Sequence, residues 1–258
     1  MDFPTTRALI DKLPAWVHAF AGRLPQPVRV PLDSREHAFR WEHAAKDAET
    51  LQVAKAVRVA SGLRAAMALA DLRHTVECGT LLRTVSDFAT EIIFLGEGLL
   101  EARLTTEQQE FIAQHYSTLP STPDELAAQE QVRYVGRKAM AKATDRIADR
   151  VGSDKELFRR ISTYLNKGYD GYVHGHYSSA MELFTGRSMT FMMAGHESDL
   201  HVCQSKVAVA GKLKEALNAF RFMAITRRMG DLDQTLRVAF DGLDATGEDA
   251  GLPCRGLV

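Results

Sequence analysis

The sequence predicts a mainly α-helical protein, folded as an antiparallel helical bundle with an N-terminal helical extension. Apolar residues recur at three- and four-residue steps through several long stretches, which is the spacing that lines one face of a helix. Helix start signals precede three of the later stretches. Alternation typical of a strand occurs only weakly in "RSMTFMMAG", so at most one short β hairpin or strand is expected, near residues 188–193.

Two long helices are expected at the centre of the bundle. The first covers residues 48–72, where the apolar stripe is Val53, Val57, Ala60, Leu63, Met67 and Ala70. The second covers residues 78–99, with the stripe Cys78, Leu81, Val85, Ala89, Ile92, Gly96 and Leu99. Its later half is apolar on nearly every side, which indicates a helix surrounded by neighbours.

Capping boxes mark the beginnings of later helices, because a Ser or Thr and a Glu or Gln three residues on satisfy the free amides of the first turn. They occur at Thr105–Gln108, Thr122–Glu125 and Ser153–Glu156. A long helix is expected from about residue 198 to 229, ended by Gly230, and an amphipathic segment from 231 to 242.

Three prolines within "LPQPVRVPLDSRE" predict an internal linker, since proline resists both helix and inner strand. We therefore expect a helical appendage and linker at 1–35, a helical bundle domain at 36–242 and a flexible tail at 243–258, where periodicity is lost.

The composition is that of a soluble globular protein, with 45% hydrophobic and 25% charged residues. Lysine and arginine total 32 against 33 acidic residues, so the net charge is 32 − 33 = −1 and no global field attracts nucleic acid. The charged N-terminus does not resemble a secretory signal, and the longest apolar stretch is too short to span a bilayer. These features predict a cytoplasmic location without a membrane partner.

The three cysteines, Cys78, Cys203 and Cys254, are too scattered to predict a disulfide framework or a paired Cys-x-x-Cys zinc site. No cofactor is expected from the sequence.

The candidate site begins at "KGYDGYVHGHYSSAMELF", residues 167–184. His174 is the candidate proton carrier there, because imidazole titrates near neutral pH. Tyr172, His176 and Tyr177 offer aromatic surface and polar groups for binding. The alternative is that these side chains only anchor a tight corner between helices.

Arg83 and Asp87 lie one turn apart on the second central helix, away from its Val85 stripe. If that helix is central, they face a second interface, where a guanidinium must be paired or must await an anion. We therefore place Arg83 and Asp87 with His174 as candidate catalytic residues. The hypothesis requires that His174 and Arg83 meet inside the bundle.

A metal site is the alternative use of the histidines His174, His176, His196 and His201, with Glu197 and Cys203 near them. Imidazole, carboxylate and thiolate are usual ligands of zinc or iron. In "HESDLH", however, the two histidines are five residues apart, about 140° around a helix, so they do not share a face. Separate surface and packing histidines explain the same pattern.

The Arg-plus-acid helix "LLRTVSDFATEI", followed by "YVHG", resembles uncharacterised bacterial proteins placed near the HEPN superfamily of small helical-bundle proteins. The resemblance covers roughly Leu51 to Phe184. It implies an antiparallel bundle, association with toxin–antitoxin or phage-defence systems, and, in active members, metal-independent RNA cleavage at a dimer interface.

For this chain the resemblance implies an RNA or nucleotide partner and a homodimer, with His174 as general acid or base and Arg83 stabilising a phosphate. Active members carry an arginine four to six residues before the histidine, where this chain has Gly168, Tyr169 and Asp170. Arg83 can replace that arginine only through tertiary contact. The expected function is thus RNA binding or a vestigial ribonuclease, with a non-catalytic interaction module and a metal-dependent hydrolase as alternatives.

Overall fold

The computed structural model describes residues 2–31, 39–116, 135–150, 170, 172–174, 181–185 and 190–255. Its helices are α1 (Pro4–Ala21), α2 (Ala48–Asp71), α3 (Thr75–Leu100), α4 (Thr106–Tyr116), α6 (Arg137–Arg150), α9 (Asp199–Thr226) and α10 (Gly230–Thr246). A short 3-10 helix, η1 (Leu252–Cys254), follows. Helix dominates the described residues, so the mainly α fold is confirmed.

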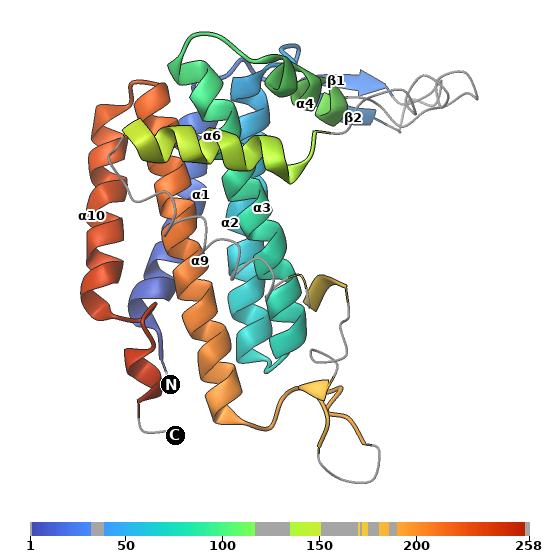
Figure 1. The fold of residues 1–258 in the computed structure, drawn as a ribbon, viewed down its shortest axis with the longest axis vertical. Helices are drawn as coiled ribbons and strands as arrows, with labels where there is room; N and C mark the ends of the chain where they lie inside the picture. Colours follow the sequence, from blue (N-terminus) through green and yellow to red (C-terminus); the bar gives the residue numbers. More distant parts are fainter. Residues whose placement is uncertain are drawn as a thin grey trace.

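The long helices form a bundle in which α3 packs against α2, α9 and α6, and Figure 1 shows α9 between α10 and the α2–α3 pair. α2 and α3 form an antiparallel pair, α9 packs against both, and α10 returns along α9. α6 crosses α3 near one end of the bundle. The main core buries apolar side chains from five helices. The largest fully buried side chains in it are Phe3, Phe20, Leu13, Leu63, Leu82, Ile92, Phe220, Leu213, Leu217 and Met223. The second long helix therefore packs against several others, as expected.

Local capping explains where several helices begin. Asp47 caps α2 by accepting the Thr50 backbone N–H at 2.8 Å. The predicted Thr105–Gln108 capping box is present, since the Thr105 N–H donates to Gln108 Oε1 at 2.8 Å and the Gln108 N–H to Thr105 Oγ1 at 3.2 Å. The other two predicted boxes, at 122–125 and 153–156, lie outside the described residues.

The N-terminal helix is part of the main core, although the sequence predicts an appendage there. α1 continues through Pro14, and its apolar face packs against α2, α9 and α10. Phe20 meets Phe220 of α9 with ring centroids 6.0 Å apart. The periodicity of α1 is sufficient for a core helix, and the prolines that follow it end the helix without separating it from the bundle.

A two-stranded antiparallel sheet lies in the segment expected to be a linker. β1 (Val28–Pro31) pairs with β2 (Phe39–Glu42), with Val28 opposite Glu42. Pro31 is the last residue of its strand, where a missing N–H is tolerated. Near residues 188–193, the described residues contain only an isolated antiparallel bridge between Phe184 and Phe191. The pairing expected near residues 188–193 is therefore limited, among the described residues, to this bridge, and the two-stranded sheet lies elsewhere in the chain.

The C-terminal segment is held on the bundle, whereas the sequence predicts a flexible tail and no disulfide framework. α10 continues to Thr246, and Cys254 forms a disulfide with Cys203 of α9. Glu248 is buried against the beginning of α1, which brings the two ends of the chain to the same end of the bundle (Figure 1). The sequence reading failed here because pairing of cysteines 51 residues apart depends on how α9 and the chain end meet.

None of the helices within the described ranges has an apolar stretch long enough to cross a lipid bilayer.

Candidate functional site

Arg83 lies inside the bundle and is held by two carboxylates. Its side chain is only 3% exposed, although it carries a charge. Its Nε donates to Asp170 Oδ1 at 2.8 Å, and its Nη1 donates to Asp87 Oδ1 one turn further along α3. Nη2 has no hydrogen-bond partner in the part of the chain that the structure describes. The predicted pairing of Arg83 with Asp87 is thus present, with Asp170 as a third member.

The charge balance of this cluster determines its chemistry. Burial disfavours the charged guanidinium, but Asp170 and Asp87 outweigh that effect, so the pKa of Arg83 lies above its usual value. One guanidinium is shared by two carboxylates, so its charge is compensated inside the bundle. A guanidinium compensated in this way is not available to a phosphate, so the predicted role of Arg83 as a phosphate-stabilising group is not what this geometry favours.

Asp170 connects Arg83 to the candidate histidine. The His174 backbone N–H donates to the Asp170 carbonyl at 3.0 Å, which closes one helical turn. Residues four apart in such a turn lie on the same face, so Asp170 and His174 are neighbours along it. His174 is exposed, whereas Arg83 is buried. The structure therefore links the two residues through Asp170 and does not give a direct contact between them.

The same turn is anchored by Tyr172, whose ring packs on α3 at Gly79. A Cβ added at Gly79 would lie 2.7 Å from Tyr172 Cδ2. The ring therefore approaches the helix more closely than it could if residue 79 carried a side chain. The Tyr172 hydroxyl donates to the Glu182 carboxylate at 3.1 Å. Burial, followed by the charge of Glu182, raises the pKa of Tyr172 to about 12. Tyr172 thus serves as an anchor of the turn.

We predict that Gly79→Ala displaces Tyr172, because the added methyl group would overlap the Tyr172 ring and push it off the surface of α3. In the wild-type protein Tyr172 should remain protonated at pH 11, and in the variant its pKa should fall toward the ordinary value of about 10. Tyrosine-labelled NMR titration measures this directly. Unfolding free energy should fall by about 1–3 kcal/mol, as for other overpacking changes.

The matched control is Gly211→Ala in α9, where an added Cβ meets nothing within 4 Å. This change should stabilise the helix by about 0.5–1 kcal/mol and leave the Tyr172 titration unchanged. If Gly79→Ala behaved like Gly211→Ala, the close packing of Tyr172 on α3 would be refuted.

The other predicted site residues are placed as follows. His176 and Tyr177 lie outside the described residues, so their predicted roles stay predictions. His196 and His201 lie together, with ring centroids 4.2 Å apart. Within the described ranges no group of three or more His, Cys, Asp or Glu residues could hold a metal ion. Cys203, considered beside those histidines, is in the disulfide.

His196 has a structural environment that explains its burial. Its Nδ1 accepts the Ser198 backbone N–H at 3.0 Å, and the residue is only 5% exposed. Arg73, at the turn between α2 and α3, donates its Nε to the His196 carbonyl at 2.5 Å. The pKa of His196 is lowered by burial first and then by the neighbouring His201 and Arg73. The ring is therefore held neutral against the turn.

A neutral buried histidine predicts a pH dependence of stability. The unfolded state binds a proton near pH 6.5, whereas folded His196 binds it only at lower pH. The stabilising contribution of neutral His196 is therefore complete above pH 6.5, and it is lost as the pH falls through the lower pKa of the folded state. Urea unfolding at pH 7.5 and 5.5 should show lower stability at the lower pH, and His196→Gln should reduce that difference.

Part of the pH dependence should survive in His196→Gln, because burial also lowers the pKa of His115 in α4. The exposed His18 of α1 provides the control: His18→Gln should leave the difference between pH 7.5 and 5.5 as in the wild type. Equal pH dependence in His196→Gln and the wild type would show that His196 is not buried neutral.

A second polar cluster lies beside Arg83, between α3 and α9, and sequence reasoning missed it. Lys212 Nζ donates to Glu215 Oε2 at 2.6 Å and to Ser86 Oγ at 3.1 Å, while the Ser86 hydroxyl donates to Glu215 Oε1 at 2.7 Å. An activated serine would need a neutral lysine as its base. Because Lys212 is paired with a carboxylate, this cluster is a polar contact between helices.

Sequence reasoning also missed Asp170, Gly79 and Glu182 as members of the site. Asp170 was noted only as a residue that replaces an expected arginine. The one available signal was the spacing of four residues between Asp170 and His174, which puts both on one helical face.

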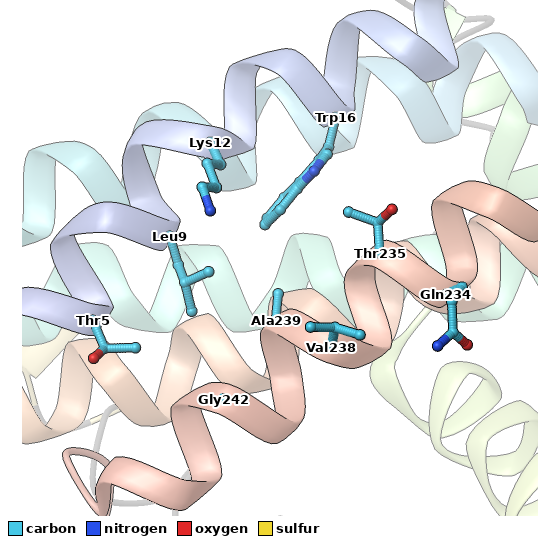
Figure 2. Close-up of a pocket in the computed structure, with 9 residues that line it drawn as sticks. All are labelled: Thr5, Leu9, Lys12, Trp16, Gln234, Thr235, Val238, Ala239 and Gly242. Carbon is cyan, nitrogen blue, oxygen red and sulfur yellow. The ribbon is translucent and has the colours of Figure 1, made fainter.

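The groove between α1 and α10 is a separate hollow on the surface (Figure 2). Its volume is about 590 Å³, and Figure 2 shows Leu9 and Trp16 of α1 across from Val238 and Ala239 of α10. Val238, which lines the groove, is 60% exposed. No pattern in the sequence indicates this groove, because it depends on how far α1 and α10 diverge.

Comparison with known proteins yields no match among family models, curated proteins or solved structures.

Proposed function

We propose that this chain is a HEPN-like RNA-binding protein in which the turn at residues 170–174 is the contact site and the ribonuclease activity is vestigial. The ligand class comes from the resemblance of the "LLRTVSDFATEI" helix and the "YVHG" turn to HEPN proteins. One structural observation supports it: Arg83 Nε contacts Asp170, which lies four residues before His174. A guanidinium thus contacts the residue four positions before His174, which is a spacing at which active HEPN proteins carry their arginine.

Loss of cleavage follows from the same contact. In an active enzyme the arginine must be available to the charge that develops on the phosphate. Here Arg83 is buried and shared by Asp87 and Asp170, so its charge is already compensated. His174 remains exposed and can still contact an RNA ligand by hydrogen bonding or stacking.

The test combines binding and cleavage with one set of labelled single-stranded RNAs. We expect the wild type to bind RNA by fluorescence anisotropy, with affinity that falls as salt is raised, and to leave the RNA intact. His174→Ala should weaken binding at least several-fold, while His18→Ala, which removes an exposed histidine of α1, should not. Absence of RNA binding would reject the proposal, and cleavage that depends on His174 would reject the vestigial part of it.

An interaction module is the second candidate, and the groove between α1 and α10 favours it. Val238 is 60% exposed at this groove, and the nearly buried Leu9 and Trp16 supply its apolar wall. If the expected homodimer forms through this groove, Val238→Asp should shift the protein toward monomer in analytical ultracentrifugation. A monomeric wild type would contradict this second function. The metal-dependent hydrolase receives no support from the described histidines.

A further inference from the structure

The C-terminal segment is fixed to the bundle by a reversal of the chain that requires glycine. α10 ends at Gly247, whose φ of +63° lies in the left-handed region. A Cβ there would lie 2.2 Å from Leu252 Cδ1, so Leu252 occupies the space that a side chain would need. The chain can therefore turn back along α9 only because residue 247 has no side chain.

Glu248 then caps the beginning of α1 from the opposite end of the sequence. Its carboxylate accepts the Thr5 N–H at 3.1 Å, the Thr6 N–H at 2.9 Å and the Thr6 hydroxyl at 2.6 Å. Phe3, the residue before α1, supplies no side-chain cap of its own. The free amides of the first turn are thus satisfied by Glu248, whose negative charge also matches the positive end of the helix dipole.

Few apolar contacts keep this segment in place. Between residues 247 and 255 only Gly247, Glu248 and Cys254 are buried, and Leu252 is 43% exposed. Lys214 of α9 adds ion pairs with Asp244 and Asp249 at the surface. The Cys203–Cys254 disulfide is therefore the main constraint that joins the segment to α9.

We propose that this disulfide is a redox-controlled latch, which holds residues 247–255 on the bundle and thereby keeps Glu248 on the N-terminus of α1. Both cysteines are buried, and Cys254, at 9% exposure against 0% for Cys203, is the one whose sulfur a dithiol reductant attacks. The S–S bond accepts two electrons and two protons to give two thiols, and the dithiol becomes an intramolecular disulfide. The remaining cysteine, Cys78, is buried and takes no part, because burial raises its pKa to about 12.

Opening of the latch has a defined structural consequence. Once Glu248 leaves, the amides of Thr5 and Thr6 lose their acceptors and the first turn of α1 becomes free to fray. Thr5 lines one end of the groove between α1 and α10 (Figure 2). Reduction should therefore loosen that end of the groove while the rest of the bundle stays folded. This inference is independent of RNA binding at the 170–174 turn.

Hydrogen exchange followed by NMR tests the latch in the full chain. On treatment with dithiothreitol, exchange of the Thr5 and Thr6 amides should accelerate at least tenfold. The Thr50 amide, capped by Asp47 at the start of α2, is the internal control and should keep its rate. Mass spectrometry after alkylation confirms that two thiols have appeared.

Two variants separate the covalent latch from the cap. Cys254→Ser should give the fast exchange of Thr5 and Thr6 without any reductant, and dithiothreitol should change it no further. Glu248→Gln should accelerate the same amides with the disulfide intact. Unchanged exchange of Thr5 and Thr6 after complete reduction would overturn the proposal. A cooperative loss of helical circular dichroism on reduction would overturn it as well, because the bond would then hold the whole bundle.

Discussion

Replacing Arg83 with alanine is expected to lower the free energy of unfolding by about 2–3 kcal/mol. The change leaves Asp87 and Asp170 facing each other without the cation between them, and breaking a buried ion pair in this way typically costs about 3–5 kcal/mol. The expected loss is smaller here because the two carboxylates are 35% and 29% exposed and water can reach them. Urea unfolding at pH 7.5 gives the value.

Two comparisons identify the cause of that loss. Arg83→Lys keeps the charge but replaces the planar guanidinium with a single ammonium, which cannot reproduce the separate Nε and Nη1 contacts to the two carboxylates, so it should be destabilised by about half as much. Arg64→Ala removes an exposed arginine that pairs with Asp11 at 3.2 Å, and it should change stability by about 0.5 kcal/mol or less. If Arg83→Ala were as mild as Arg64→Ala, Arg83 would not hold a buried cluster.

Replacing Cys254 with serine is expected to lower the free energy of unfolding by about 4 kcal/mol, the chain-entropy value for a loop of this size. The disulfide joins residues 51 apart in the sequence, so its loss restores conformational freedom to a long stretch of the unfolded chain. Because serine is close to cysteine in size, it adds little strain at the buried position 254 of the folded state. Denaturant unfolding without reductant measures the difference.

The control uses the wild type under reducing conditions. Dithiothreitol should lower the stability of the wild type to nearly that of Cys254→Ser, while Cys254→Ser itself should not respond to reductant. If dithiothreitol lowered the stability of Cys254→Ser, another cysteine would have to form a disulfide in that variant. Equal stability of the wild type with and without reductant would show that residues 203 and 254 are not joined in the protein.

The helices were predictable because their signals are local. The stripes in α2 and α3 and the Thr105–Gln108 capping box depend only on residues a few positions apart, and the observed helices follow them, although Val57 of the α2 stripe is 49% exposed. The role of α1 was not predictable, since three prolines after it suggested a separate unit. Only the packing of Phe20 on Phe220, some 200 residues away, reveals that α1 belongs to the core.

The candidate site was predictable in part. Burial of Arg83 beside Asp87 followed from the apolar surroundings of α3 and from the one-turn spacing. The contact of Arg83 with Asp170 and the packing of Tyr172 on Gly79 could not be derived, because they connect segments about 90 residues apart. The disulfide was missed for the same reason. A low number of cysteines excludes a framework of disulfides, but it does not exclude one pair that tertiary packing brings together.

The disulfide also bears on the expected cytoplasmic location, which stays a prediction. Disulfides inside the cytoplasm are usually transient or redox-sensing, whereas permanent ones occur in oxidising compartments. A latch that opens with a dithiol is compatible with a redox-sensing disulfide in the cytoplasm. The reduction potential of the Cys203–Cys254 pair, measured against a glutathione series, distinguishes the two, since a permanent structural bond is expected below about −300 mV.

A double-mutant cycle between Arg83 and Asp170 tests most directly whether α3 anchors the turn that carries His174. The four proteins are the wild type, Arg83→Ala, Asp170→Ala and the double variant, each unfolded in urea at pH 7.5. We predict a coupling free energy of about 1–3 kcal/mol, as for residues in one buried ion-pair network. A coupling near zero, with additive losses, would mean that Arg83 does not hold Asp170 and that the turn is not fixed to the bundle by this contact.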